Sequence, residues 1–453
     1  MSTLQNTPSR DREALEALRR HARPLAPGAS DDTDLAGLLA GSRYALLGEA
    51  SHGTDEFYRE RAEITKRLIA EHGFAAVAVE ADWPDALRID RYVRGEPGDA
   101  TARDALADFR RFPTWMWRNR VVLEFVEWLR AHNSALPVER RTGFYGIDLY
   151  SLFTSIDAVL AYLDRTDPQA AQRARERYAC FDHFHQDSQA YAYAARFGLS
   201  ASCEHEVVVQ LQELVAARGR DAERAAPVDA TARFQAEQNA RLVRNAEAYY
   251  RTMFSGRVSS WNLRDRHMVE MLEALHDHLA AGRREPPRIA VWAHNSHLGD
   301  ASATEMGDSG EWNVGQLVRE RHGAAAALVG FSTHHGTVTA ANDWDAPHEQ
   351  MRVRPGLEGS FEALFHRVGI ARFCLVLRGN AALAGALAAP RLQRAIGVIY
   401  RPETERQSHY FATRLPDQFD AIVHIDQTRG VEPLDRTEPH TEGEAPETYP
   451  SGV

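Results

Sequence analysis

The stretch from residue 44 to residue 68 constrains the fold of this chain most strongly, because it combines a strand, a polar loop and a helix. It reads YALLGEASHGTDEFYRERAEITKRL. Residues 44–47 are apolar and of strand type, and Gly48 and Gly53 allow the following loop to turn sharply and to approach other groups closely. A polar turn between a strand and a helix predicts a site at the carboxyl end of the strand, where ligands usually bind in open α/β sheets.

The helix of this stretch is predicted to start after Thr54, its N-cap, with two acids in its first turn, where negative charge favours the helix dipole. Residues recur at helical spacing on one face of this helix, namely Phe57, Arg61, Ile64 and Leu68. A guanidinium on an apolar face is costly unless a carboxylate meets it. We therefore expect Arg61 to pair with Glu49 or with Glu80.

Strand-type segments recur along the rest of the chain, at 75–79, 144–147, 288–292, 325–331, 337–341, 373–377, 396–399 and 421–425. The run at 75–79, AAVAV, is continuous and apolar, which is typical of a strand buried on both faces. Between 151 and 282 the chain instead carries Ala-, Arg- and Glu-rich segments with helical periodicity. These patterns predict an α/β fold with a mostly parallel central sheet flanked by helices and with a large helical insertion or cap.

The same sequence patterns divide the chain into four parts. Residues 1–30 form an N-terminal segment with a short helix, and residues 31–150 and 283–429 form the α/β core. Residues 151–282 form the helical region. From 430 to 453 proline, glycine and acids dominate, which predicts a disordered tail.

Composition narrows the classes of partner. The chain of 453 residues is 44% hydrophobic and 26% charged, with a net charge of −11, which disfavours nucleic acid and anionic membranes as partners. Three cysteines without a CxxC motif rule out a disulfide framework and favour a reducing compartment. No signal-type or membrane-length apolar run is found. We therefore expect a cytoplasmic protein with no membrane partner; the sequence leaves its oligomeric state open.

Ionisable side chains stand at the ends of several predicted strands, namely Glu49, His52, Glu80, Asp148, His294 and His297. Because the carboxyl ends of parallel strands share one edge, residues far apart in sequence can converge there. Convergence of carboxylates with histidines is what general acid–base chemistry requires. The pattern therefore predicts an acid–base site at this edge.

Other interpretations of these residues stay open. Either strand-end acid, Glu80 or Asp148, could instead accept hydrogen bonds from a following helix N-terminus. Ser51 could act as a nucleophile, but its surroundings, GEASHG, differ from the GxSxG elbow, so it ranks below His52 as a base. His294 and His297 could ligate zinc or manganese with nearby carboxylates. No HExxH motif occurs, so metal is the second choice.

Several segments together resemble the erythromycin esterase family. They are GEASHGTDEFYRERAEITKRLI, AVAVEADW, GFYGIDLYSL, VWAHNSHLGD, GFSTHHGTVTAA and IGVIYRPETERQSHYF, and the resemblance extends from about residue 44 to about residue 426. It implies an α/β core with a helical part beside it. It also implies a hydrolase that opens a macrolide lactone or a related carboxylic ester, with water as the nucleophile.

The resemblance also implies roles for individual residues. His52 falls on the base that activates water. The other catalytic positions fall on Glu49, Arg61, Glu80 and His294. Substrate contacts are expected from His297, His267 and Asp148. Apart from the resemblance, the helical region is expected to wall a wide cleft, and Trp83, Trp115 or Trp117 could line it, although we favour them as core residues.

The expected function is thus hydrolysis of a small-molecule ester or lactone, without cofactor or metal. Two rivals remain open. One is a metal-dependent hydrolase that acts through a metal-bound hydroxide, and the other is a non-catalytic protein that binds a small molecule in the same cleft.

Overall fold

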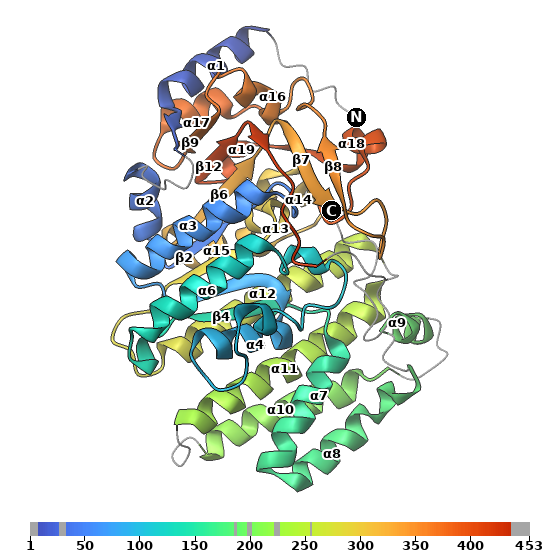
Figure 1. Cartoon of the computed structure of the whole chain (residues 1–453). Helices are drawn as coiled ribbons and strands as arrows, with labels where there is room; N and C mark the ends of the chain where they lie inside the picture. Colours follow the sequence, from blue (N-terminus) through green and yellow to red (C-terminus); the bar gives the residue numbers. More distant parts are fainter. Residues whose placement is uncertain are drawn as a thin grey trace.

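The computed structural model describes residues 8–26, 33–184, 188–196, 202–221, 227–253 and 256–435. Its centre is an eight-stranded sheet (Figure 1). In spatial order the strands are β1 (Arg23–Pro24), β9 (Arg372–Val376), β12 (Ala421–Ile425), β6 (Ala326–Ser332), β2 (Tyr44–Leu47), β5 (Ile289–Trp292), β3 (Ala76–Asp82) and β4 (Gly143–Asp148).

The six strands from β12 to β4 are parallel, whereas β9 and β1 are antiparallel to their neighbours. The predicted mostly parallel α/β sheet is therefore confirmed. One predicted strand, at 396–399, is wrong. Ile396 and Ile399 make only single bridges, to Ser51 and to Ala341, because this segment crosses from the loop after β2 to the end of another strand.

Two hydrophobic cores lie on the two faces of the sheet, because successive residues of a strand point to opposite faces. Leu47 and Trp292 belong to the core under α3 (Asp55–His72) and α6 (Arg120–Ser134), whereas Leu46 and Val291 belong to the opposite core. The remaining helices outside the helical region are α1 (Pro8–His21), α2 (Thr33–Ala40), α4 (Trp83–Val93), α5 (Ala102–Ala105), α13 (Asn295–Leu298), α14 (Glu305–Asp308), α15 (Val314–His322), α16 (Phe361–His366), α17 (Ala381–Leu387), α18 (Glu405–Ser408) and α19 (Leu415–Gln418).

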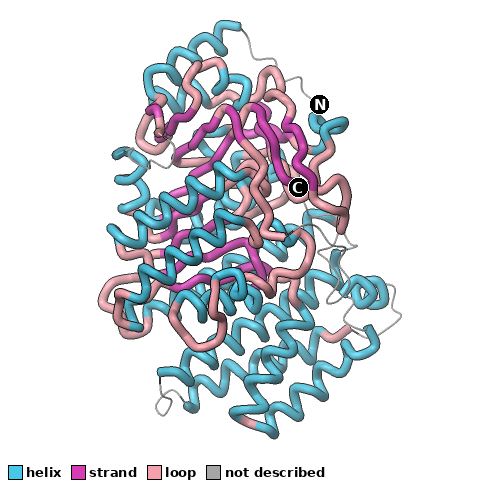
Figure 2. The backbone as a smooth tube through the Cα atoms, viewed as in Figure 1, coloured by secondary structure: helices cyan, strands magenta, loops and turns pink. Residues whose placement is uncertain are grey.

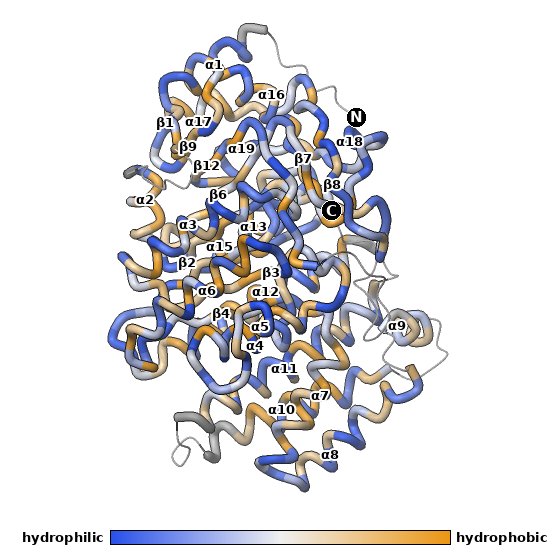
Figure 3. The backbone as a smooth tube through the Cα atoms, in the orientation of Figure 1, coloured by the Kyte–Doolittle hydropathy of each residue, from blue (hydrophilic) through white to orange (hydrophobic). Residues whose placement is uncertain are grey.

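The helical region contains α7 (Leu152–Thr166), α8 (Pro168–Tyr178), α9 (Ser188–Arg196), α10 (Glu204–Asp221), α11 (Pro227–Thr252) and α12 (Arg257–Ala280). Figure 2 shows helices beside the strands of the sheet, with the helical region at the bottom of the view. Hydrophilic residues predominate on α8, at the outer side of this region (Figure 3). The region is not a detached cap, since α12 packs directly on the sheet next to β4.

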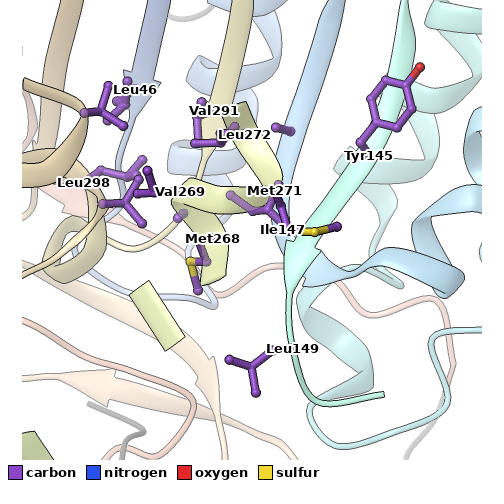
Figure 4. Close-up of a cluster of buried hydrophobic side chains, with 14 of the residues drawn as sticks. Leu46, Tyr145, Ile147, Leu149, Met268, Val269, Met271, Leu272, Val291 and Leu298 are labelled. Carbon is purple, nitrogen blue, oxygen red and sulfur yellow. The ribbon is translucent and has the colours of Figure 1, made fainter. Parts of the chain in front are cut away.

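The packing of α12 fixes which of its residues reach the carboxyl edge of the sheet. Figure 4 shows Met268, Val269, Met271 and Leu272 of this helix gathered with Leu46, Ile147 and Val291 of three strands. All seven side chains are buried. With this apolar stretch against the middle of the sheet, the preceding turns of α12 lie at the edge where the parallel strands end.

Two sequence predictions need correction or completion here. Cys180 and Cys203 form a disulfide in the helical region, with Cα atoms 5.9 Å apart, although the cysteine pattern argued against disulfides. Of the predicted disordered tail, residues 430–435 are described. Val431 is buried, the amide of Leu434 donates to the Arg118 carbonyl, and residues 436–453 lie outside the described part.

Two small sheets complete the fold. One consists of β13 (Gln427–Thr428), β7 (His335–Ala340) and β8 (Glu349–Val353), and the other of β10 (Arg391–Arg394) and β11 (Tyr410–Thr413). Among the described residues, no helix combines the length and the apolar character that crossing a membrane requires.

Candidate active site

The loop after β2 is held tightly at the carboxyl edge of the sheet. A β-carbon at Gly48 would lie 2.2 Å from Asn295 Oδ1, and one at Gly53 would lie 1.8 Å from the Thr339 carbonyl oxygen. Both glycines are therefore required by close approach, as the sequence predicted. Ile396 joins the loop from the other side. Its amide donates to the Ala50 carbonyl, and its own carbonyl accepts from the amide of His52.

Glu49, His52 and Arg61 form a buried chain of contacts. Arg61 Nη2 donates to Glu49 Oε2 at 2.6 Å, which confirms the predicted partner of this arginine. The other oxygen, Glu49 Oε1, lies 2.9 Å from His52 Nδ1. A carboxylate can only accept, so this contact places the proton of the neutral imidazole on Nδ1 and leaves the lone pair on Nε2.

The N-terminus of α3 departs in detail from the predicted cap. Thr54 occupies the N-cap position with extended backbone, but its side chain caps no helix amide. Its hydroxyl instead contacts the hydroxyl of Ser51, and both residues are buried. Ser51 thus faces the start of α3.

Glu80 is the centre of a second group of contacts and lies within β3, two residues before its end. Oε1 accepts from Arg264 Nη2 at 2.8 Å and lies 3.3 Å from His297 Nε2, and Oε2 accepts from the amide of His294 at 2.8 Å. The same Oε1 is 4.0 Å from His52 Nε2. The carboxylate therefore faces the free nitrogen of His52 across a gap that suits one water molecule.

Arg264, from α12, connects Glu80 to Asp148 at the end of β4. Its Nε and Nη2 donate to the two carboxylate oxygens of Asp148 at 3.0 and 2.6 Å. Its neighbour Asp265 holds His297, with Nδ1 of the imidazole 2.9 Å from Oδ1. Such two-pronged arginine–carboxylate pairs fix orientation as well as charge.

Burial and charge set the protonation of these groups. Burial lowers the pKa of His294 well below its ordinary value, and the neighbouring His52 ring lowers it further. Burial also opposes protonation of His297, but Asp265 and Glu80 outweigh it and raise the pKa of His297 to about 10. Burial alone would raise the pKa of Glu80, yet His297, His52 and Arg264 hold it well below its usual range. At neutral pH the centre therefore holds a Glu80 carboxylate and a His297 imidazolium.

A cavity opens beside His52 and Glu80. Its volume is about 70 Å³, and its charged and polar lining includes Asp148, Tyr150 and Arg264. One wall comes from the segment between α5 and α6, which contributes Phe109, Arg111, Phe112, Pro113, Met116 and Trp117. Of the three tryptophans considered from the sequence, Trp117 lines this cavity, while Trp83 and Trp115 are buried in the cores.

Five predicted site residues lie behind this surface. Glu49 contacts His52 and is itself held by Arg61, and the centroid of the His294 ring lies 4.8 Å from that of the His52 ring. His297 stacks on Trp261, and burial lowers the pKa of His267 to about 4. His267 Nε2 lies 3.1 Å from the Asp148 carbonyl oxygen. His297 and His267 are not among the residues that line the cavity, and protein groups contact both rings, so their expected substrate contacts stay a prediction.

Sequence reasoning missed Arg264 and Asp265, although both belong to the segment LRDRHMVEM that drew attention to His267. A usable signal was present. Arg264 precedes Met268, Met271 and Leu272 at helical spacing, so it is a guanidinium on an apolar face, as Arg61 is. The rule that predicted a partner for Arg61 would also have predicted one for Arg264.

The metal alternative centred on His294 and His297, but neither belongs to a group of side chains with metal-site spacing. Within the described ranges, the one such group is His334, His335 and Asp426. His297 has Asp265, Glu80 and Arg264 around its two nitrogens, and His294 Nδ1 bonds to Ser296.

A mostly parallel α/β sheet with paired histidines and carboxylates at its carboxyl edge defines an α/β protein with a buried histidine–carboxylate centre. The erythromycin esterase family model matches residues 69–428, which is more than half of the chain. The chain therefore belongs to the erythromycin esterase family. The matched range includes Glu80, Asp148 and Arg264, whereas Glu49 and His52 precede it.

Three solved structures share the fold, each at 19% sequence identity. A Bacillus cereus protein has a TM-score of 0.76 over 94% of this chain and 99% of its own. A succinoglycan biosynthesis protein reaches 0.75 over 95% of this chain and 100% of its own. A mutant of the erythromycin esterase EreC in its open conformation reaches 0.61 over 89% of this chain and 95% of its own.

Proposed function

We propose that this protein hydrolyses a carboxylic ester or lactone by direct attack of a water molecule that His52 activates. The observation that carries the proposal is the arrangement of Glu49, His52 and Glu80 at the cavity. Glu49 fixes the proton on Nδ1, so that the basic Nε2 points toward Glu80 Oε1, 4.0 Å away. A water between these two acceptors donates one hydrogen to each, which turns its lone pair toward a substrate carbonyl.

The reaction then balances with the groups present. The water oxygen bonds to the carbonyl carbon as His52 Nε2 takes a proton, and negative charge develops on the carbonyl oxygen. Collapse of the tetrahedral intermediate breaks the bond to the leaving alkoxide, which takes the proton back from His52. A well-placed base of this kind contributes about 10²–10⁴-fold to the rate.

The remaining residues have supporting roles in this proposal. Arg264 is a cation of the cavity wall beside Glu80, and there it stabilises the oxyanion. Asp148 orients that arginine, and the buried Arg61 holds Glu49 in place. His294 and His297 do not line the cavity and act through His52 and Glu80. The neutral His294 ring buttresses His52, and the charged His297 keeps Glu80 ionised.

The size of the cavity bears on the substrate. Pockets that enclose drug-sized ligands measure about 300–1,000 Å³, far above the volume found here. A bulky lactone therefore requires the wall between α5 and α6 to move outward. The solved structure of the EreC mutant is described as an open conformation, which is consistent with such a movement. A small ester reaches Nε2 of His52 without that movement.

The decisive experiment is mass spectrometry of purified protein incubated with a panel of macrolide lactones and simple esters. We expect at least one substrate to gain the mass of one water, with multiple turnovers. The His52→Gln variant, matched for concentration and checked for folding, serves as the control. Stoichiometric binding of a panel compound without any hydrolysed product would favour the non-catalytic binding protein instead.

A further inference from the structure

A second group of histidines gathers at the carboxyl ends of β6 and β12, outside the site described above. We name it the histidine cluster, and it consists of His334, His335, His366, His424 and Asp426. Two of its members come from the GFSTHHGTVTAA segment, whose histidines have no role in the proposed hydrolysis.

The fold brings these residues together through the backbone. His334 lies in the turn after β6, and His335 is the first residue of β7; both of their amides donate to the Asp426 carbonyl, at 3.2 and 3.1 Å. The next residue, Gly336, has φ +141°, and a β-carbon there would lie 2.0 Å from the Thr428 carbonyl oxygen. The turn is therefore fixed against β13, and the two imidazoles stay beside the Asp426 carboxylate.

The nitrogen atoms of the turn face each other. Nδ1 of His334 lies 3.0 Å from Nδ1 of His335, and one proton at most can occupy that gap. The His334 ring also stacks on the His366 ring, with centroids 3.9 Å apart. Several imidazoles thus gather around one carboxylate, which is a set of donor atoms that transition-metal ions prefer.

The carboxylate is oriented by the other two histidines. His366 Nδ1 lies 2.8 and 3.0 Å from the two oxygens of Asp426, and His424 Nε2 lies 3.4 Å from Oδ1. His424 is fully buried, and its Nδ1 bonds to Ser332 Oγ at 2.8 Å. Hydrogen bonds of this kind to a ligating carboxylate are the usual outer support of a metal site.

We propose that His334, His335 and Asp426 bind a divalent transition-metal ion, zinc in the first place, and that His366 and His424 orient the carboxylate. The ligand atoms of the three residues all lie within 4.8 Å of one another. Zinc bonds of about 2.0–2.2 Å bring neighbouring ligands to roughly 3.3 Å, which small rotations of the side chains achieve. Imidazole nitrogens favour zinc over magnesium and calcium.

The surroundings suit a cation. The Asp426 side chain is 19% exposed and that of His366 is 48% exposed, so an ion and its water ligands have access. Arg394 donates to the His334 carbonyl, but its charge is matched by Glu405 at 3.4 Å. Binding would link the β6–β7 turn to the end of β12, so zinc should stabilise the folded protein.

The test uses the full chain without a histidine tag, stripped of metal, and titrates it with zinc by calorimetry and by thermal unfolding. We expect one zinc per chain and a rise in Tm of roughly 3–5 °C at about 100 times Kd. Cobalt, as a spectroscopic substitute, should give the visible absorption of a site with nitrogen ligands.

Variants locate the ion. His334→Gln and Asp426→Asn should each weaken zinc binding at least tenfold, whereas His183→Ala, at an exposed histidine on the short helix Ala179–Phe184, should leave it unchanged. His335→Gln serves where either variant fails to fold. The proposal is overturned if the wild type binds no zinc, or if folded variants bind it as the wild type does. Neither measurement depends on esterase activity.

Discussion

The two histidine-containing regions of this protein differ in how many carboxylates they offer to each imidazole. At the active site Glu49 holds His52, and behind the cavity surface Asp265 with Glu80 holds His297. In the histidine cluster, four imidazoles share the carboxylate of Asp426. The first arrangement gives His52 and His297 each a carboxylate partner at Nδ1 and so suits proton transfer. In the second arrangement two imidazole nitrogens share at most one proton beside that carboxylate, which suits a cation.

The difference also appears in burial. The charges of the active-site region are almost fully buried, and each is met by an opposite charge within hydrogen-bond distance, as Arg61 is by Glu49 and Arg264 is by Asp148. The histidine cluster is open to solvent at His366. Removing one member should therefore lower the free energy of unfolding strongly in the first region. In the second region the loss should be small unless an ion is bound.

The largest expected effect is on catalysis at His52. His52→Gln keeps a polar side chain of similar size but removes the base, so kcat should fall by about 10²–10⁴-fold with little change in substrate binding. Steady-state kinetics on the substrate found by mass spectrometry measures this. Ser51→Ala is the matched neighbour, and it should retain substantial activity because its hydroxyl contacts Thr54. Complete inactivation of a folded Ser51→Ala protein would instead make Ser51 the nucleophile.

The second effect is on stability at Arg264. Arg264→Gln leaves Glu80 and Asp148 buried without their cation, which should lower the free energy of unfolding by about 3–5 kcal/mol. Urea denaturation measures the change. Arg59→Gln is the control, since this side chain is 43% exposed and such surface pairs contribute about 0–1 kcal/mol. If both variants lose the same free energy of unfolding, the buried network contributes no more to stability than an exposed ion pair does.

A third effect depends on pH and on His297. Its pKa of about 10 when folded lies above the ordinary value of about 6.5, so its stabilisation is complete below about pH 6.5 and is lost as the pH rises toward 10. The slope of the free energy of unfolding against pH that is due to His297 is at most about 1.4 kcal/mol per pH unit. Urea denaturation across this range should show a steeper decline for the wild type than for His297→Gln. Parallel curves would mean that His297 is neutral when folded.

The sequence predicted best what depends on neighbours in the chain. β2, its loop and α3 are contiguous, so the glycine contacts and the Arg61–Glu49 pair followed from one stretch. The parallel sheet followed from apolar runs of strand length. The segment at 396–399 looks the same locally, yet it pairs with two different partners for one residue each, which no local pattern encodes.

What the sequence missed depends on how distant elements pack. The family resemblance directed attention to His267, but the packing of Met268 and Leu272 against the sheet brings Arg264 to the cavity edge. Cys180 and Cys203 are separated by 23 positions in the chain and meet through the packing of the helical region. The histidine cluster needs β6 beside β12, and these strands are far apart in the chain. In each case the missing information was a tertiary contact.

The smallest expected effect tests whether the two regions act independently. Dialysis against a strong chelator should remove zinc from the histidine cluster and lower Tm by the few degrees that zinc adds. It should change kcat by less than about twofold, because separated sites without shared partners act additively and the nitrogens of His297 are already held by protein groups. Activity and Tm are measured on the same samples, before and after zinc is restored. The contrary outcome is that chelation abolishes activity and zinc restores it, both in the wild type and in Asp426→Asn. That result would place the metal in the cavity beside His52, with a metal-bound hydroxide as nucleophile in place of direct base catalysis.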